Sequence, residues 1–208
     1  MEISFGPGGN GESWGRRKFP EQLPEYLSGL GLNGYEIECG RGVRLAEKTP
    51  ALLPGLAKEH GIYVTLHAPY FISLSSVEEE TRLKSVEYIF QSAQAAHAVG
   101  ARKIVVHSGS CSKMTREEAT ELAKDTLKKA QERLDSEGLS EIIICPETMG
   151  KVNQLGTLDE VLALCSVDER MIPCVDFGHL YARSQGTELN DETAPADYAA
   201  ILDAIAAA

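Results

Sequence analysis

The sequence lacks several features that would assign it to a class at once. It has no uninterrupted apolar run of about eighteen residues, which a membrane-spanning helix requires. The first residues carry no basic stretch followed by a long apolar run, so a secretory signal is not expected. The five cysteines are odd in number and never form C-x-x-C. These absences predict a cytoplasmic protein with reduced thiols and no membrane partner.

The composition is that of one ordinary globular domain. With 208 residues, 43% hydrophobic and 25% charged, the chain is long enough for one well-buried core and short for two, so we expect a single domain over residues 1–208. The net charge of -11 argues mildly against a partner held by bulk electrostatics, such as long nucleic acid. Acidic side chains that bind metal ions would weaken that argument, because the ions cancel their charge.

Apolar, β-branched runs alternate with longer amphipathic segments along the whole chain. This order predicts about six βα units, either in an open doubly wound sheet or in a barrel. The expected strands are residues 3–5, 35–38, 62–67, 103–107, 141–147 and 171–176. The expected helices are residues 20–30, 50–60, 77–100, 116–138, 157–165 and 194–208.

Four consecutive predicted strands end on a residue that can bind metal. The strand ends carry His67, His107, Glu147 and Asp176, and His179 follows three residues after the last. Because the carboxyl ends of parallel strands lie on one side of a sheet or barrel, these side chains are expected to converge. Imidazoles mixed with carboxylates suit zinc best, with manganese and iron as alternatives. One histidine at a strand end is more often structural, but four strand ends in succession favour a metal site.

Two other histidines and a glycine-rich segment do not indicate a functional site. His60 and His97 lie near the ends of predicted helices, where a histidine interacts favourably with the last carbonyls, so no catalytic role is expected. Residues 6–11, G-P-G-G-N-G, match the dinucleotide-binding pattern G-x-G-x-x-G. That pattern requires a helix to open at the last glycine, whereas the predicted helix begins at Pro20. A nucleotide site is therefore disfavoured.

Three segments resemble the endonuclease IV family of apurinic/apyrimidinic endonucleases, within the xylose-isomerase-like TIM-barrel superfamily. Residues 66–74, L-H-A-P-Y-F-I-S-L, resemble the family's L-H-A-P-Y-x-I-N-L. Residues 106–110, V-H-S-G-S, resemble x-H-P-G-S, and residues 175–179, V-D-F-G-H, resemble L-D-T-x-H. The region after Glu147 is a looser match to E-N-T-A-G. The resemblance implies a (β/α)8 barrel, of which this chain carries about six units and lacks the C-terminal part.

The resemblance also implies roles for the candidate residues. His67 and His107 would hold one metal ion, Glu147 would bridge to a second and act as the catalytic carboxylate, Asp176 would bind the second and His179 a third. The implied reaction is hydrolysis of a DNA phosphodiester beside an abasic site, in which the ions activate the attacking water and stabilise the leaving oxygen.

Substrate contacts are expected on the same face. By the resemblance, Tyr70 would face the lesion. Arg41 and Arg44, in the predicted loop after the second strand, are candidates for contacts with phosphate, although ordinary solvated loop charge explains them equally well.

Departures from the family pattern leave other functions open. No histidine follows His179, six units do not close an eight-stranded barrel, and residues 38–44 lack the family's DNA-probing Arg-Gln pair. We therefore expect a chain truncated at its C-terminus and impaired in catalysis, with a naturally shortened relative that has an incomplete site as the alternative. A metal-dependent sugar isomerase or epimerase is the alternative, with Glu36 or Glu38 moving a proton. A non-catalytic metal-binding protein is the third, and the oligomeric state is left open.

Overall fold

A parallel four-stranded sheet forms the centre of the molecule. The computed structural model describes residues 3–208, and its strands are adjacent in chain order: β1 (Gly34–Glu38), β2 (Tyr63–His67), β3 (Lys103–His107) and β4 (Ile143–Glu147). All three pairings are parallel, with Glu38 opposite His67 and His107 opposite Glu147. The predicted α/β class with parallel strands is confirmed.

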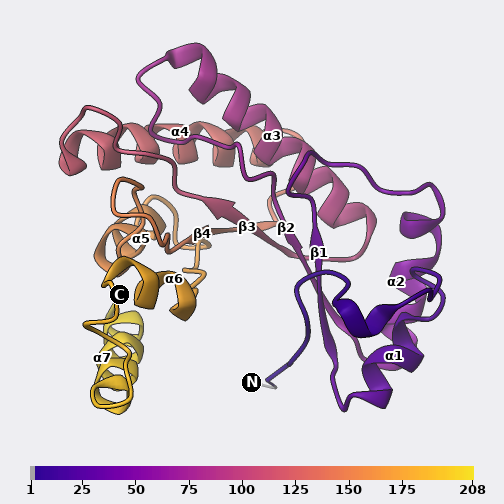
Figure 1. Cartoon of the computed structure of the whole chain (residues 1–208). Helices are drawn as coiled ribbons and strands as arrows, with labels where there is room; N and C mark the ends of the chain where they lie inside the picture. The colour runs from indigo at the N-terminus through magenta and orange to yellow at the C-terminus, as the bar shows by residue number, and fades with distance from the viewer. Residues whose placement is uncertain (1–2) are drawn as a thin grey trace.

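Helices cover one face of this sheet, as Figure 1 shows. The two long helices, α3 and α4, lie across the strands and pack against each other, while α1 and α2 lie beyond β1 and α5 to α7 beyond β4. The helices are α1 (Leu23–Gly29), α2 (Lys48–His60), α3 (Glu79–Ala98), α4 (Arg116–Ser136), α5 (Leu158–Cys165), α6 (Phe177–Arg183) and α7 (Ala194–Ala207), with a short 3-10 turn at Glu12–Trp14.

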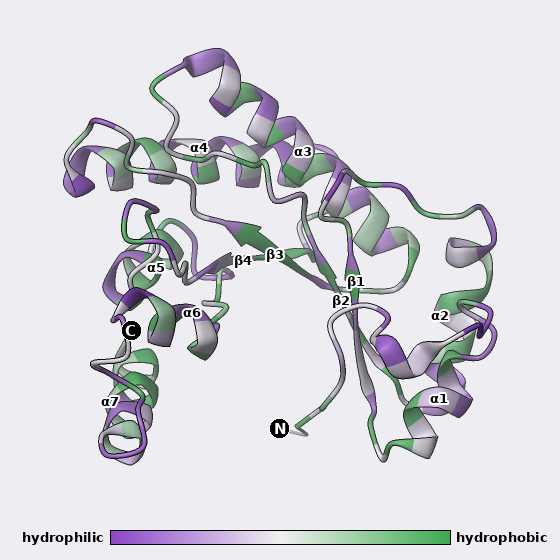
Figure 2. Cartoon of the chain, in the orientation of Figure 1, coloured by the Kyte–Doolittle hydropathy of each residue, from purple (hydrophilic) through white to green (hydrophobic). Residues whose placement is uncertain are grey.

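Strand alternation separates an apolar face from a polar one. Successive side chains of a strand point to opposite faces, so Leu66 and Val106 join the core against the helices while His67 and His107 face the other way. The core beneath α3 and α4 consists of aliphatic side chains with little or no exposure, and Figure 2 shows the apolar strands at its centre. The helix-covered face thus stabilises the sheet, and the opposite face is left for polar side chains.

Two of the six expected strands are reduced to isolated bridges. Residues 3–5 form no named strand; the segment after them runs beside β1 and forms one bridge, between Gly8 and Glu36. Residues 171–176 form one bridge, between Cys174 and Glu147. Two prolines face these edges without an N–H to donate: Pro7, whose carbonyl accepts from the Glu36 amide, and Pro146 of β4, whose carbonyl accepts from the Cys174 amide. Their missing donors limit regular pairing at both edges.

Helix α6 was not predicted from the sequence. It spans seven residues directly after the last expected strand, and Asp176 caps its first turn by accepting a hydrogen bond from the His179 amide at 2.8 Å. Within residues 3–208, no helix combines the length and apolar character that crossing a membrane demands.

Candidate metal centre

The carboxyl ends of β2, β3 and β4 bring three of the predicted residues together. Glu147 Oε2 lies 3.3 Å from His67 Nε2 and 3.1 Å from His107 Nε2. The two imidazole rings are nearly perpendicular, with centroids 5.1 Å apart. One donor atom from each of the three residues lies within 4.8 Å of the others, so one metal ion could contact all three.

A second group shares the same carboxylate. Glu147 Oε1 lies 3.7 Å from His179 Nδ1, and Asp176 Oδ2 lies 3.6 Å from the same nitrogen. Donor atoms of Glu147, Asp176 and His179 again lie within 4.8 Å of one another. The resemblance implied a third metal ion for His179, whereas the structure places His179 beside Asp176 and Glu147. All five candidate ligands therefore lie around one carboxylate.

Hydrogen bonds to backbone carbonyls orient the imidazoles of His67 and His179. His67 Nδ1 lies 2.9 Å from the Ala68 carbonyl oxygen, and His179 Nδ1 lies 2.8 Å from the Thr148 carbonyl oxygen. A carbonyl only accepts, so each Nδ1 carries a proton. In His67 this leaves Nε2 facing Glu147, whereas in His179 the nitrogen near Glu147 and Asp176 is the same Nδ1 that donates to Thr148. The His67 contact is the pattern by which proteins fix the tautomer of a ligating histidine.

Burial and charge couple His67 to Glu147. Burial would raise the pKa of the Glu147 carboxyl, which is only 5% exposed, but the hydrogen bonds from His107 and His67 and their charge lower it to about 2. Burial would lower the pKa of His67, but its bonds to Glu147 and the Ala68 carbonyl, with the charge of Glu147 and Glu38, raise it to about 9. A proton on His67 thus occupies the position that a metal ion would take.

Two further carboxylates lie on the polar face of the sheet, on β1. Glu36 accepts a hydrogen bond from the Thr65 hydroxyl at 2.7 Å, and burial raises its pKa. Glu38 is exposed and lies opposite His67 in the strand register. Glu36 and Glu38 therefore place two acidic side chains beside the His67 edge of the site.

The expected substrate-binding residues lie in loops beside the centre. Tyr70, 60% exposed, follows β2, and its amide donates to the Gly40 carbonyl at 3.2 Å. That contact joins the Tyr70 loop to the loop after β1, which carries Arg41 and Arg44 with exposed side chains. Their contact with a substrate stays a prediction.

The residues excluded from the site lie elsewhere. His60 is the last residue of α2, and His97 lies in the last turn of α3, where its Nδ1 is 2.7 Å from Glu141 Oε1. After Gly11 the chain forms only the three-residue 3-10 turn, and the first α-helix begins at Leu23. The glycine segment thus lacks the helix that a dinucleotide site needs.

Comparison with known proteins places the chain in a family. The model of the xylose isomerase-like TIM barrel family matches residues 24–205. The chain belongs to this family. The predicted TIM-barrel class and the predicted resemblance are confirmed, with four barrel strands formed as regular strands in the described residues.

The relatives of this TIM-barrel chain include proteins named as endonucleases. It is 34% identical over 169 residues to an uncharacterised protein of Methanocaldococcus jannaschii, covering 80% of this chain and 59% of the relative. It is 30% identical over 152 residues to the probable endonuclease 4 of Malacoplasma penetrans, covering 71% and 48%. The chain thus spans about half to three fifths of the length of these relatives.

The chain shares its fold with solved structures of two kinds, an endonuclease and an epimerase-like protein. The crystal structure of endonuclease IV from Thermus thermophilus superposes with a TM-score of 0.65 at 24% identity, covering 88% of this chain and 64% of that one. A D-tagatose 3-epimerase-like protein superposes with a TM-score of 0.61 at 22% identity, covering 75% and 60%. Likeness at these identities shows the fold alone.

Proposed function

We propose that the protein is a metal-dependent phosphodiesterase that cleaves DNA beside abasic sites, in which Glu147 would be a ligand common to two divalent metal ions. The observation that carries the proposal is the division of the carboxylate. Oε2 of Glu147 faces His67 and His107, whereas Oε1 faces His179 and its neighbour Asp176. One carboxylate between two ligand groups is the arrangement expected of a two-metal hydrolytic site.

The residues present fit such ions. His67, His107 and Glu147 would hold the first, and Glu147, Asp176 and His179 the second. Imidazole and carboxylate donors together suit zinc, with manganese and iron as alternatives. When bound, a metal pair supplies Lewis acidity that activates water and offsets charge on the phosphate oxygens.

The remaining groups would orient the ligands and the substrate. The carbonyl of Ala68 holds the His67 ring with Nε2 toward Glu147, and the carbonyl of Thr148 holds the His179 ring beside Glu147 and Asp176. Tyr70 offers an exposed aromatic surface on which an unpaired base or sugar can rest. Arg41 and Arg44 offer two cationic side chains to the DNA backbone. Relatives named probable endonuclease 4 support DNA as the substrate.

The test is cleavage of an oligonucleotide containing one abasic site, with zinc or manganese added. We expect metal-dependent cleavage that is lost in Glu147→Gln and kept in Glu121→Gln, a matched change on the exposed surface of α4. We also predict that this chain alone cleaves the oligonucleotide slowly, and the rate of cleavage in the same assay measures this. Absence of metal-dependent cleavage by the unmodified chain would remove the phosphodiesterase proposal.

A sugar isomerase or epimerase is the second candidate. It is favoured by Glu36 and Glu38, which place two carboxylates on the same face of the sheet as His67, one of them with a raised pKa suited to proton transfer. Incorporation of solvent deuterium next to the carbonyl of a ketose would detect this activity. Metal binding without turnover of either substrate would favour a non-catalytic metal-binding protein.

A further inference from the structure

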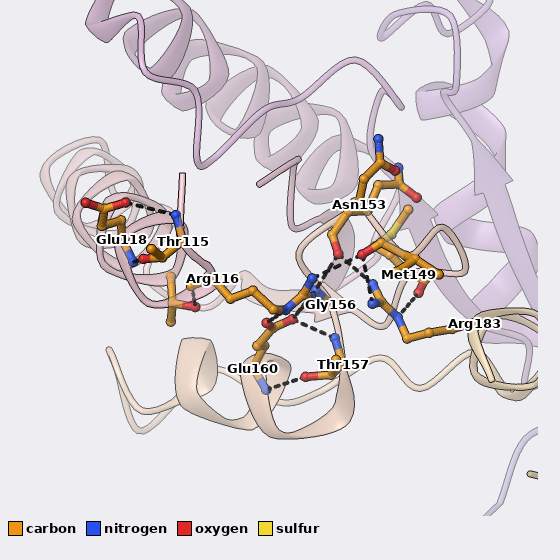
Figure 3. Close-up of polar contacts among 12 residues, drawn as sticks. Thr115, Arg116, Glu118, Met149, Asn153, Gly156, Thr157, Glu160 and Arg183 are labelled. Carbon is orange, nitrogen blue, oxygen red and sulfur yellow. Dashed lines mark hydrogen bonds and ion pairs between the residues drawn. The ribbon is translucent and has the colours of Figure 1, made fainter. Parts of the chain in front are cut away.

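The loop of residues 149–156, shortly after β4, is held by hydrogen bonds from an arginine side chain rather than by regular secondary structure. Arg183, the last residue of α6, donates to three of its carbonyls: Nε to Met149 at 2.8 Å, Nη1 to Val152 at 3.4 Å and Nη2 to Gln154 at 2.6 Å (Figure 3). One planar guanidinium thus fixes three points of the loop with donors on three separate nitrogens, whereas all three donors of an ammonium radiate from one nitrogen.

A second arginine approaches the loop from the other side. Arg116, the first residue of α4, donates to the carbonyls of Val152 and Gln154 at 3.1 and 3.0 Å. Glu160 accepts from Arg116 Nη2 at 2.7 Å and from the amides of Gly156 and Thr157 at 2.7 and 2.8 Å. The carboxylate therefore balances the guanidinium charge and secures the end of the loop, as Figure 3 shows.

The same helix joins this loop to the metal centre. His179 and Arg183 are four residues apart on α6, about one helical turn. They donate to adjacent carbonyls, His179 to Thr148 and Arg183 to Met149, both at 2.8 Å. The loop also packs directly on the imidazole, since a Cβ added at Gly150 would lie 3.2 Å from His179 Cδ2.

We propose that Arg183 is a positioning residue for the ligand group of Glu147, Asp176 and His179. It fixes α6 against the backbone that follows Glu147, and Arg116 with Glu160 holds that backbone from the opposite side. This inference rests on the proposed metal centre. Loss of Arg183 is expected to affect Asp176 and His179 alone, because β2, β3 and β4 hold His67, His107 and Glu147 independently of the loop.

The experiment is a calorimetric titration of the full chain with zinc or manganese. In the unmodified protein two binding steps are expected, which His107→Ala and His179→Ala assign to the first and second groups. Arg183→Ala should weaken the second step about 10–100-fold, the usual effect of losing an outer partner of a metal ligand, and leave the first step unchanged. Arg102→Ala, an exposed arginine at the opposite end of the β3 strand, should change neither step.

Arg183→Lys keeps the positive charge and provides a second test of the proposal if the alanine variant misfolds. It should restore little affinity, because the three donors of an ammonium share one nitrogen and lack the spread of the three guanidinium nitrogens; full restoration would overturn the role of the guanidinium. Hydrogen exchange should accelerate at the Met149 amide, which donates to Gly156 within the loop. Unchanged second-step affinity in both variants would refute the inference while leaving the metal centre intact. Absence of any binding step in the unmodified protein would instead remove the metal centre itself.

Discussion

The metal-free protein should lose stability as the pH rises from 6.5 to 9. The cause is the contact between His67 and Glu147, which raises the pKa of His67 to about 9. Because the folded pKa lies above the ordinary value of 6.5, the stabilisation is fully present below pH 6.5 and is lost as the pH passes 9. On the acid side, the pKa of Glu147 is lowered to about 2, so its stabilisation is present above pH 4.5 and fades as the pH falls toward 2.

The magnitude follows from the His67 pKa. At about 1.36 kcal/mol per pH unit, the rise from 6.5 to about 9 corresponds to about 3 kcal/mol of unfolding free energy. The His67 side chain is only 15% exposed, so solvent screens the pair weakly. The same contact lowers the pKa of Glu147, so the two changes describe one interaction and are not added.

Urea unfolding of the chelator-treated protein at several pH values measures this loss. Glu147→Gln serves as the control, since it removes the charge that raises the pKa of His67 and should flatten the dependence above pH 6.5. Metal affinity should change in the opposite direction, rising up to about tenfold per pH unit in this range because the ion displaces the His67 proton. Parallel pH curves for the two proteins would refute the coupling between His67 and Glu147.

Three other expectations follow from the site and its surroundings. His107→Ala should lower metal affinity by more than about 100-fold, beyond the loss of an outer partner, while the thermal midpoint of the metal-free protein changes little; the reverse result would make His107 structural. Gly6→Ala should lower the free energy of unfolding, measured with urea, by about 3 kcal/mol or more, because the added Cβ would lie 1.7 Å from the Gly34 oxygen. Gly55→Ala, where the added Cβ meets open space, is the control and should be neutral or stabilising. Tyr70→Ala should weaken binding of an abasic oligonucleotide about tenfold and leave metal affinity unchanged, and equal binding would exclude Tyr70 from the DNA contact.

The central strands and the first ligand group were predictable from the sequence for a physical reason. Runs such as residues 104–106 are apolar because the strand is buried, and the next residue, His107, leaves the core at the strand's carboxyl end. Parallel pairing then places His107 opposite Glu147 without further information. Pattern and topology together therefore specify the positions of these two residues.

The parts that were missed leave weaker signals. Helix α6 is too short to show a helical repeat and contains Gly178, although Asp176 at its start is a recognisable capping residue. The edge segments were predicted as strands from their apolar residues, but Pro7 in the first segment and Pro146 of β4, beside the second, lack the N–H that a longer ladder needs, and each segment forms a single bridge. Contacts from Arg183 to backbone carbonyls have no sequence signature, because every residue carries the acceptor.

Anomalous diffraction from crystals of the protein grown with zinc tests the central claim most directly. The account predicts two peaks, one beside each oxygen of Glu147: the first contacting His67 and His107, the second contacting Asp176 and His179, at about 2.0–2.2 Å from the ligand atoms. A single peak away from Glu147, or full zinc occupancy elsewhere with none at this carboxylate, would contradict it.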